Sequence, residues 1–219
     1  MKQVKELGDW WFTDEETHQI EYMMQNGGIY QPNQRIAAIN HSNPRRTAID
    51  VGANIGLWAK DFCNYFSHVI CFEPVTSTRE VLKKNLEGCN NKTIHGVGLG
   101  NKNEEVTIKI LEGSSGHATI TGEGDVILRE ENITIVPMDS FSFTDVDLIK
   151  VDCQGYEIEI LRGATNTLKE NSPVLCLETP VRDEAEIANF NEIEELLNGL
   201  GYSNGNRVGK ETYWRKQWG

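Results

Sequence analysis

Residues 50–56 of this 219-residue chain have the types and spacing of a ligand-binding loop. The segment reads Asp-Val-Gly-Ala-Asn-Ile-Gly, so Asp50, Gly52 and Gly56 directly follow a short apolar run. A dinucleotide-binding loop needs a further glycine where its backbone approaches the pyrophosphate. This chain has Asn54 at that position. The loop therefore favours a cofactor without phosphate groups, and a plain tight turn is the structural alternative.

Glu73 ends the next apolar run, residues 68–72. At the end of the second strand of an α/β sheet, an acid can accept hydrogen bonds from both ribose hydroxyls of an adenosine. Asp50 adds a second negative charge near the glycine loop. The two acids together favour a cationic adenosine cofactor. S-adenosylmethionine fits this description because it carries both a sulfonium and an ammonium group.

A third group of residues has the chemistry of proton transfer. Lys150 and Asp152 are two residues apart in a strand-like run, so they lie on the same side of the backbone. Glu178 ends the following strand. A positioned carboxylate can act as a general base that takes a proton from a poor nucleophile such as an alcohol, and we predict Asp152 as this base, supported by Glu178 and Glu157. An internal ion pair of Lys150 and a helix N-terminal position of Glu157 are the structural alternatives.

His117 is a second candidate base, provided that its Gly-rich loop folds over the cleft. A lone histidine in a loop is more often simply solvated. Clustered carboxylates also suit Mg²⁺, but no spacing in the sequence demands a metal, and the five cysteines include no CxxC pair. We therefore assign no metal ligands.

An alternation of strand-like and helix-like segments must position these residues. Between residues 47 and 99 the pattern is β-α-β-α-β, which predicts a parallel sheet with right-handed crossovers. A β insertion interrupts the alternation, which resumes at residue 147 and ends in a strand pair near Tyr202 and Tyr213. The predicted strands are 47–51, 68–72, 93–99, 106–111, 118–121, 133–136, 147–151 and 174–177, and the predicted helices are 13–25, 55–66, 77–86, 156–168 and 190–200.

The predicted fold class is α/β, with a Rossmann-like, mostly parallel sheet that has an antiparallel edge. We assign this domain to residues 47–219 and a helical extension to residues 1–46. Aromatic residues concentrate in the extension, among them Tyr22 and Tyr30. They can pack against the sheet, or their faces can stack on a sugar ring or an adenosine.

Charge and composition exclude several classes of protein. The chain has 33 acidic and 21 basic residues and a net charge of −12, which argues against general binding to nucleic acids or anionic membranes. No run approaches the roughly 20 apolar residues that span a bilayer, and the first residues lack the apolar core of a signal peptide. We expect a cytoplasmic protein without membrane insertion, and a homodimer is one expectation for its assembly.

Several motifs occur together in an order that resembles the FkbM-type methyltransferases, a branch of the class I S-adenosylmethionine-dependent enzymes. The matching segments are DVGANIG at 50–56, FEP at 72–74, GVGLGNKNEEV at 96–106, MDSF at 138–141, DLIKVDCQGYEIEILRGA at 147–164 and LE at 177–178. The resemblance implies a Rossmann-like fold and O-methylation, often of a hydroxyl on a sugar or another small or conjugated acceptor. One departure is Gln154, which stands where the family usually has a glutamate.

The resemblance also implies roles for individual residues. The first loop would line the methionine side of the cofactor, Glu73 would hold the ribose, and the segment around Gly98 would lie near the adenine. The cofactor-binding set that follows is Asp50, Gly52, Ala53, Asn54, Gly56, Glu73, Pro74, Gly98, Leu99 and Asp152.

The resulting hypothesis is an S-adenosylmethionine-dependent O-methyltransferase that acts on a hydroxyl of a sugar or glycoconjugate and leaves S-adenosylhomocysteine. Three alternatives stay open. They are a methyltransferase for nucleic acids or other small molecules, a nicotinamide-dependent oxidoreductase on a similar sheet, and a binding module without chemistry.

Overall fold

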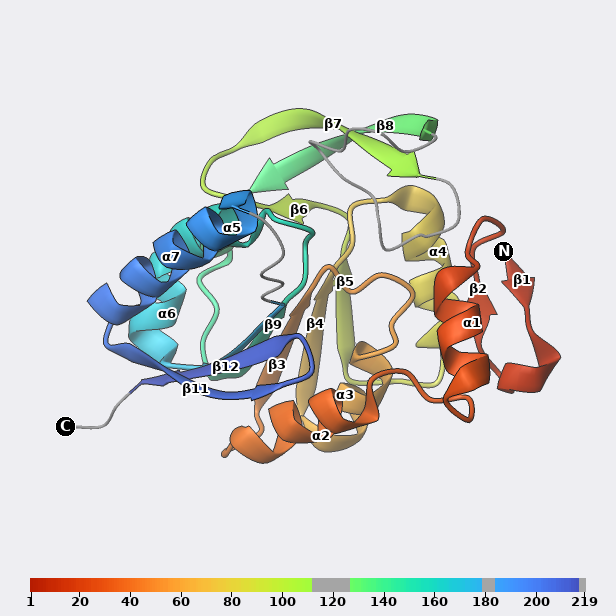
Figure 1. Ribbon diagram of the computed structural model, residues 1–219, viewed down its shortest axis with the longest axis horizontal. Coiled ribbons are helices and arrows are strands. Elements are labelled where there is room, and N and C mark those ends of the chain that lie inside the picture. The colour runs from red at the N-terminus through yellow and green to blue at the C-terminus, as the bar shows by residue number, and fades with distance from the viewer. Residues whose placement is uncertain (112–126, 179–183, 217–219) are drawn as a thin grey trace.

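Seven strands form the main sheet of the computed structural model, which describes residues 1–111, 127–178 and 184–216 (Figure 1). The strand order is β11-β12-β10-β9-β3-β4-β5, and β12 runs antiparallel to both of its neighbours. The other pairs, from β10 to β5, are parallel. The strands are β3 (Thr47–Val51), β4 (His68–Phe72), β5 (Lys92–His95), β9 (Val146–Val151), β10 (Val174–Glu178), β11 (Tyr202–Val208) and β12 (Glu211–Lys216).

Helices cover both faces of this sheet, because its central strands are apolar on both sides. In β3, Ile49 and Val51 pack in one core with residues of the last three helices, whereas Ala48 packs in another with residues of the earlier helices. The helices are α2 (Pro32–His41), α3 (Ala59–Tyr65) and α4 (Thr76–Asn85) on one face and α5 (Glu157–Arg162), α6 (Thr165–Asn171) and α7 (Glu184–Gly199) on the other.

A second, three-stranded sheet lies over one end of the main sheet and is formed by β6 (Gly98–Leu99), β7 (Glu104–Leu111) and β8 (Ile127–Val136) (Figure 1). It accounts for the predicted insertion. The predicted strand 118–121 and the candidate base His117 lie outside the described residues.

The N-terminal extension consists of a small strand pair, β1 (Lys2–Gln3) and β2 (Trp11–Phe12), a 3₁₀ turn, and helices α1 (His18–Gln25) and α2. Asn85 of α4 binds it to the main body: its amide accepts a hydrogen bond from the Trp11 N–H at 2.8 Å and donates one to the Trp11 carbonyl at 2.9 Å. Among the described residues, no helix combines the length and apolar character needed to cross a membrane.

Several predicted element boundaries were wrong. Strand β8 begins at Ile127 rather than residue 133, and helix α7 begins at Glu184 rather than residue 190. Helix α1 begins at His18 rather than residue 13, with the Glu16 carboxylate accepting a hydrogen bond from the Gln19 N–H at 2.7 Å in its first turn. The predicted helix 55–66 begins only at Ala59, because the loop before it has left-handed residues. The predicted strand 93–99 divides between two sheets, and the predicted helix 156–168 divides near Gly163.

Candidate active site

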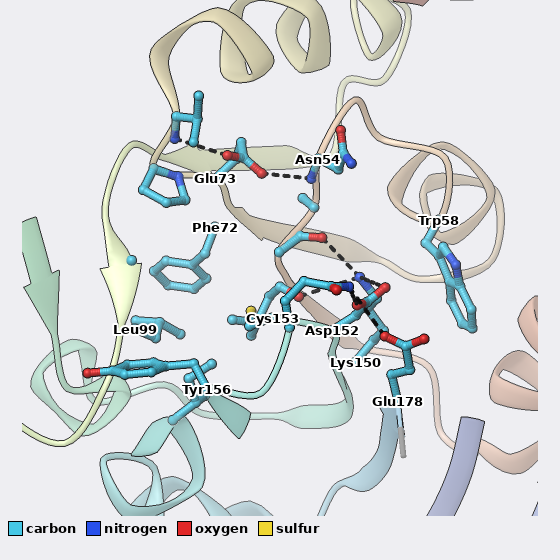
Figure 2. A pocket seen from close by; sticks show the side chains of 18 of the residues that line it. Asn54, Trp58, Phe72, Glu73, Leu99, Lys150, Asp152, Cys153, Tyr156 and Glu178 are labelled. Atoms are coloured by element: carbon cyan, nitrogen blue, oxygen red, sulfur yellow. Dashed lines mark hydrogen bonds and ion pairs between the residues drawn. The ribbon is translucent and has the colours of Figure 1, made fainter. Parts of the chain in front are cut away.

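A cavity of about 410 Å³ opens at the carboxyl ends of β3, β4 and β9. This is the edge at which open α/β sheets bind ligands. Most of the predicted site residues line it: Gly52, Ala53, Asn54, Glu73, Pro74, Gly98, Leu99, Lys150, Asp152 and Glu178. Figure 2 shows Phe72, Leu99 and Tyr156 gathered at one end, Trp58 at the other, and the charged side chains between them.

The loop after β3 turns sharply because it contains three residues with positive φ. Gly52 has φ +70°, Asn54 +49° and Gly56 +93°. A Cβ atom at Gly52 would overlap the carbonyl oxygen of Asp152, so only glycine fits between the two strand ends. The N–H groups of Gly52 and Ala53 both donate to the Phe72 carbonyl, each at 3.1 Å, which ties the loop to the end of β4.

Glu73 points back toward this loop (Figure 2). One of its carboxylate oxygens accepts a hydrogen bond from the Asn54 N–H at 2.9 Å, and the other accepts one from the Val75 N–H at 3.0 Å. Burial raises the pKa of Glu73 to about 7, against the lowering effect of these N–H groups. A carboxylate offers about four lone-pair sites, so two remain for hydroxyl donors in the cavity.

Lys150 forms the floor of the site. Its ammonium group lies 3.2 Å from Asp50 Oδ1 and 3.8 Å from Asp152 Oδ2, and it donates to the Gly52 carbonyl at 3.0 Å. Burial lowers the pKa of Lys150, but Asp50 and Asp152 outweigh burial and raise it above its ordinary value. Asp50 is completely buried beneath the loop and is absent from the cavity lining, so it acts on the cavity through Lys150.

Asp152 and Glu178 meet at the mouth of the cavity, as their positions at adjacent strand ends predicted. The Gln154 amide lies between them, donating to Asp152 Oδ1 at 3.3 Å and to Glu178 Oε2 at 3.5 Å. Burial and the neighbouring Asp152 raise the pKa of Glu178 to about 8. The raised pKa favours the protonated form of the Glu178 carboxyl beside Asp152.

Glu157 does not face the cavity. Its carboxylate accepts hydrogen bonds from the Cys153 N–H at 2.9 Å and the Gly155 N–H at 3.2 Å, at the start of α5. The structure thus gives it the helix N-terminal position that was the alternative to a supporting role in catalysis. The Gln154 amide, at the position of the expected glutamate, bridges the two acids instead.

Sequence reasoning missed a large part of the lining. Trp58, Gln31 and Lys210 also line the cavity, with Lys210 3.6 Å from Glu178, and no local pattern singles them out. Tyr156 closes the other end with apolar residues of the small sheet. Position within the family motif is the one signal that could have flagged Tyr156. Besides Gly98 and Leu99, the lining residues from the extension and the small sheet are His18, Gln19, Tyr22, Tyr30, Gln31, Ile108, Ile133 and Ile135.

Solved structures share this architecture. An FkbM methyltransferase from Methylobacillus flagellatus KT matches with a TM-score of 0.53 at 21% sequence identity. The match covers 78% of this chain and 43% of the M. flagellatus chain. A methyltransferase from Geobacter sulfurreducens has a TM-score of 0.53 at 11% identity and covers 91% and 86% of the two chains. The strand order, the antiparallel β12 and the cavity at the strand ends define a class I methyltransferase fold.

The model of the methyltransferase FkbM domain matches residues 50–203, and the chain belongs to this family. Among curated proteins, it is 27% identical over 122 residues to the hexuronic acid methyltransferase AglP of Haloferax volcanii, a match that covers 55% of this chain and 50% of that protein. The chain thus spans half of this relative and less than half of the M. flagellatus enzyme. The resemblance noted in the sequence is confirmed.

Proposed function

We propose that this FkbM-type methyltransferase transfers a methyl group from S-adenosylmethionine to a hydroxyl of a carbohydrate, with Asp152 as the base. The observation that supports this proposal is the meeting of Glu73, Lys150, Asp152 and Glu178 around one cavity at the carboxyl edge of the sheet. The cofactor, the acceptor and the residue roles are all parts of the proposal.

The residues present fit the cofactor. Glu73 keeps lone pairs for the two ribose hydroxyls, and the cavity end at Phe72, Leu99 and Tyr156 is apolar enough for a purine. The loop at Asn54 offers no third glycine for a pyrophosphate, which disfavours the nicotinamide alternative. When bound, S-adenosylmethionine supplies an electrophilic methyl group.

Asp152 performs proton transfer in this proposal. The acceptor oxygen forms a bond to the methyl carbon as the bond from that carbon to sulfur breaks, and the hydroxyl proton passes to the Asp152 carboxylate. A positioned base of this kind contributes roughly 10² to 10⁴ in rate. Glu178, whose pKa is raised to about 8, lies beside Asp152, and the Lys150 ammonium group lies 3.8 Å from the Asp152 carboxylate.

A carbohydrate acceptor is favoured by the sugar-methylating relative and by the aromatic and acidic lining. Incubation with labelled S-adenosylmethionine and a panel of glycosides tests the assignment, with nucleic-acid fragments as the competing class. Label found on a sugar oxygen supports the proposal. Transfer only to nitrogen, or only to nucleic acid, contradicts it. The homodimer and the cytoplasmic location remain predictions from the sequence.

A further inference from the structure

The mouth of the cavity has a wall from the N-terminal extension. Trp58 Nε1 donates a hydrogen bond to Gln31 Oε1 at 2.8 Å, and Gln31 Nε2 donates to Glu211 Oε1 at 3.1 Å. One side-chain amide thus joins three segments, namely the extension, the start of α3 and the start of β12. Tyr30, next to Gln31, lines the same cavity as Trp58. We call Tyr30, Gln31 and Trp58 the aromatic wall.

Gln31 adopts an unusual backbone conformation. Its φ of 42° and ψ of 53° lie in the left-handed region, although it is not a glycine, and it stands immediately before Pro32 at the start of α2. Such conformations cost free energy in non-glycine residues and persist where the surroundings hold them. Here the two hydrogen bonds of the side chain hold the residue beside the cavity. A glycine at this position would relieve the strain and lose both bonds.

Negative charge faces the aromatic wall. Burial, followed by the charge of Asp152, raises the pKa of the Tyr30 phenol, and Glu178 and Glu211 act in the same direction against Lys150. Lys150 is already paired with Asp50 at 3.2 Å, and Lys210 lies 3.6 Å from Glu178 on the exposed side. An acceptor at the mouth therefore contacts aromatic faces on one side and carboxyl groups on the other.

These surroundings suit some ring compounds and exclude others. The C–H face of a sugar ring packs on an aromatic side chain, and its hydroxyl groups donate to carboxylate oxygens. A carboxylate on the sugar would instead lie near Asp152. At an effective dielectric constant of 20, the repulsion between two like charges about 7 Å apart lowers the affinity of the charged sugar at least ten-fold.

We propose, on the basis of the proposed function, that the mouth between the aromatic wall and the Asp152–Glu178 pair is the acceptor subsite. Gln31 positions the aromatic wall of this subsite. The subsite selects a neutral or amine-bearing polyol over a uronic acid. Gln31 is a positioning residue, because it acts through Trp58 and Tyr30.

Acceptor binding tests the charge selection without relying on turnover. The full chain saturated with S-adenosylhomocysteine is titrated with methyl glucoside, methyl glucosaminide and methyl glucuronide, followed by ligand-observed NMR. We expect the first two to bind at least ten-fold more tightly than the glucuronide. Equal or tighter binding of the glucuronide, or no binding of any glycoside, would overturn the inference. Failure of S-adenosylhomocysteine itself to bind would instead overturn the proposed function.

Variants of Gln31 test the wall. Gln31→Gly suits the left-handed backbone and removes both hydrogen bonds, and Gln31→Met keeps the volume without them. Asn33→Ala removes an exposed amide two residues further on, in α2, and serves as the control. We expect both Gln31 variants to weaken binding of the preferred glycoside about 5- to 30-fold, the worth of one to two hydrogen bonds, with S-adenosylhomocysteine affinity within two-fold. Unchanged glycoside affinity in both variants, or an equal loss for the two ligands, would refute the role.

Discussion

Ionisation of Glu73 is expected to control the pH dependence of cofactor binding. Burial raises the pKa of this carboxyl from its ordinary value of 4.5 to about 7. Ribose hydroxyls donate hydrogen bonds to carboxylate oxygens, and these bonds are strongest when the acceptor is ionised. The cofactor should therefore bind preferentially to the ionised form, and that form becomes more abundant as the pH rises.

The size of the effect follows from linkage between proton and ligand binding. With a pKa of about 7, roughly one protein molecule in eleven has Glu73 ionised at pH 6, and roughly ten in eleven at pH 8. Affinity should thus fall about ten-fold from pH 8 to pH 6. The stability of the free protein depends on pH in the opposite direction. Between pH 4.5 and about 7 the folded state binds the extra proton, so the Glu73 contribution to the free energy of unfolding falls as the pH rises.

Isothermal calorimetry over pH 6–8, in buffers with different ionisation enthalpies, measures both the affinity and the proton released. Glu73→Gln removes the titration and one charged acceptor, so we expect binding about 30-fold weaker at pH 8, the worth of about 2 kcal/mol, and insensitive to Glu73 ionisation. Glu80→Gln, an exposed carboxylate on α4, is the matched control. Protonation of the ligand's own ionisable groups affects all three proteins equally, so it cancels when their pH profiles are compared. Identical pH profiles for the wild type and Glu73→Gln would refute the reasoning.

Further substitutions probe the base, the floor and the loop. Asp152→Asn should lower kcat by about 10² to 10⁴ while the calorimetric affinity for S-adenosylhomocysteine stays within about three-fold, and an unchanged kcat would remove Asp152 as the base. Lys150→Met leaves the buried Asp50 carboxylate without its cation and should lower the free energy of unfolding in urea by about 3–5 kcal/mol. Adding Asp50→Asn should restore part of this loss. Full stability of the single variant would contradict the prediction. Gly52→Ala should cost at least about 2 kcal/mol, because its Cβ overlaps the Asp152 carbonyl and φ is +70°. Gly88→Ala, with open space around the added Cβ, is the control for Gly52 in the same unfolding assay, and an equal loss in both would refute the steric argument.

The central strands were predictable because burial on both faces leaves a continuous apolar run. The predicted strands 47–51 and 68–72 match β3 and β4 residue for residue. The third predicted strand failed because apolar residues continue from β5 into β6 although the chain changes sheets at Gly96 and Val97. Periodicity reports which side chains are buried, and it does not report against which sheet they pack.

The charged half of the site was predictable for a related reason. Glu73, Asp152 and Glu178 all end parallel strands, and parallel strands place their carboxyl ends at one edge. The aromatic wall was not predictable, because Gln31 contacts Trp58 and Glu211 only through tertiary packing, and Glu211 lies 180 residues further along the chain. From the sequence, Tyr30 can be a core residue or a stacking surface; in the structure it lines the cavity and also packs against two buried apolar clusters.

Lys150 couples the two halves of the site. Its partner across the β3–β9 pair is Asp50, and its ammonium group also reaches the Gly52 carbonyl and Asp152. A shift of the glycine loop therefore moves the cation that lies beside the base, and a shift of the base disturbs the loop. One cation between two carboxylates leaves a net negative charge beneath the cavity, and in a buried environment this charge favours a cationic ligand. The same lysine thus fixes the loop geometry and sets the charge that the cavity presents.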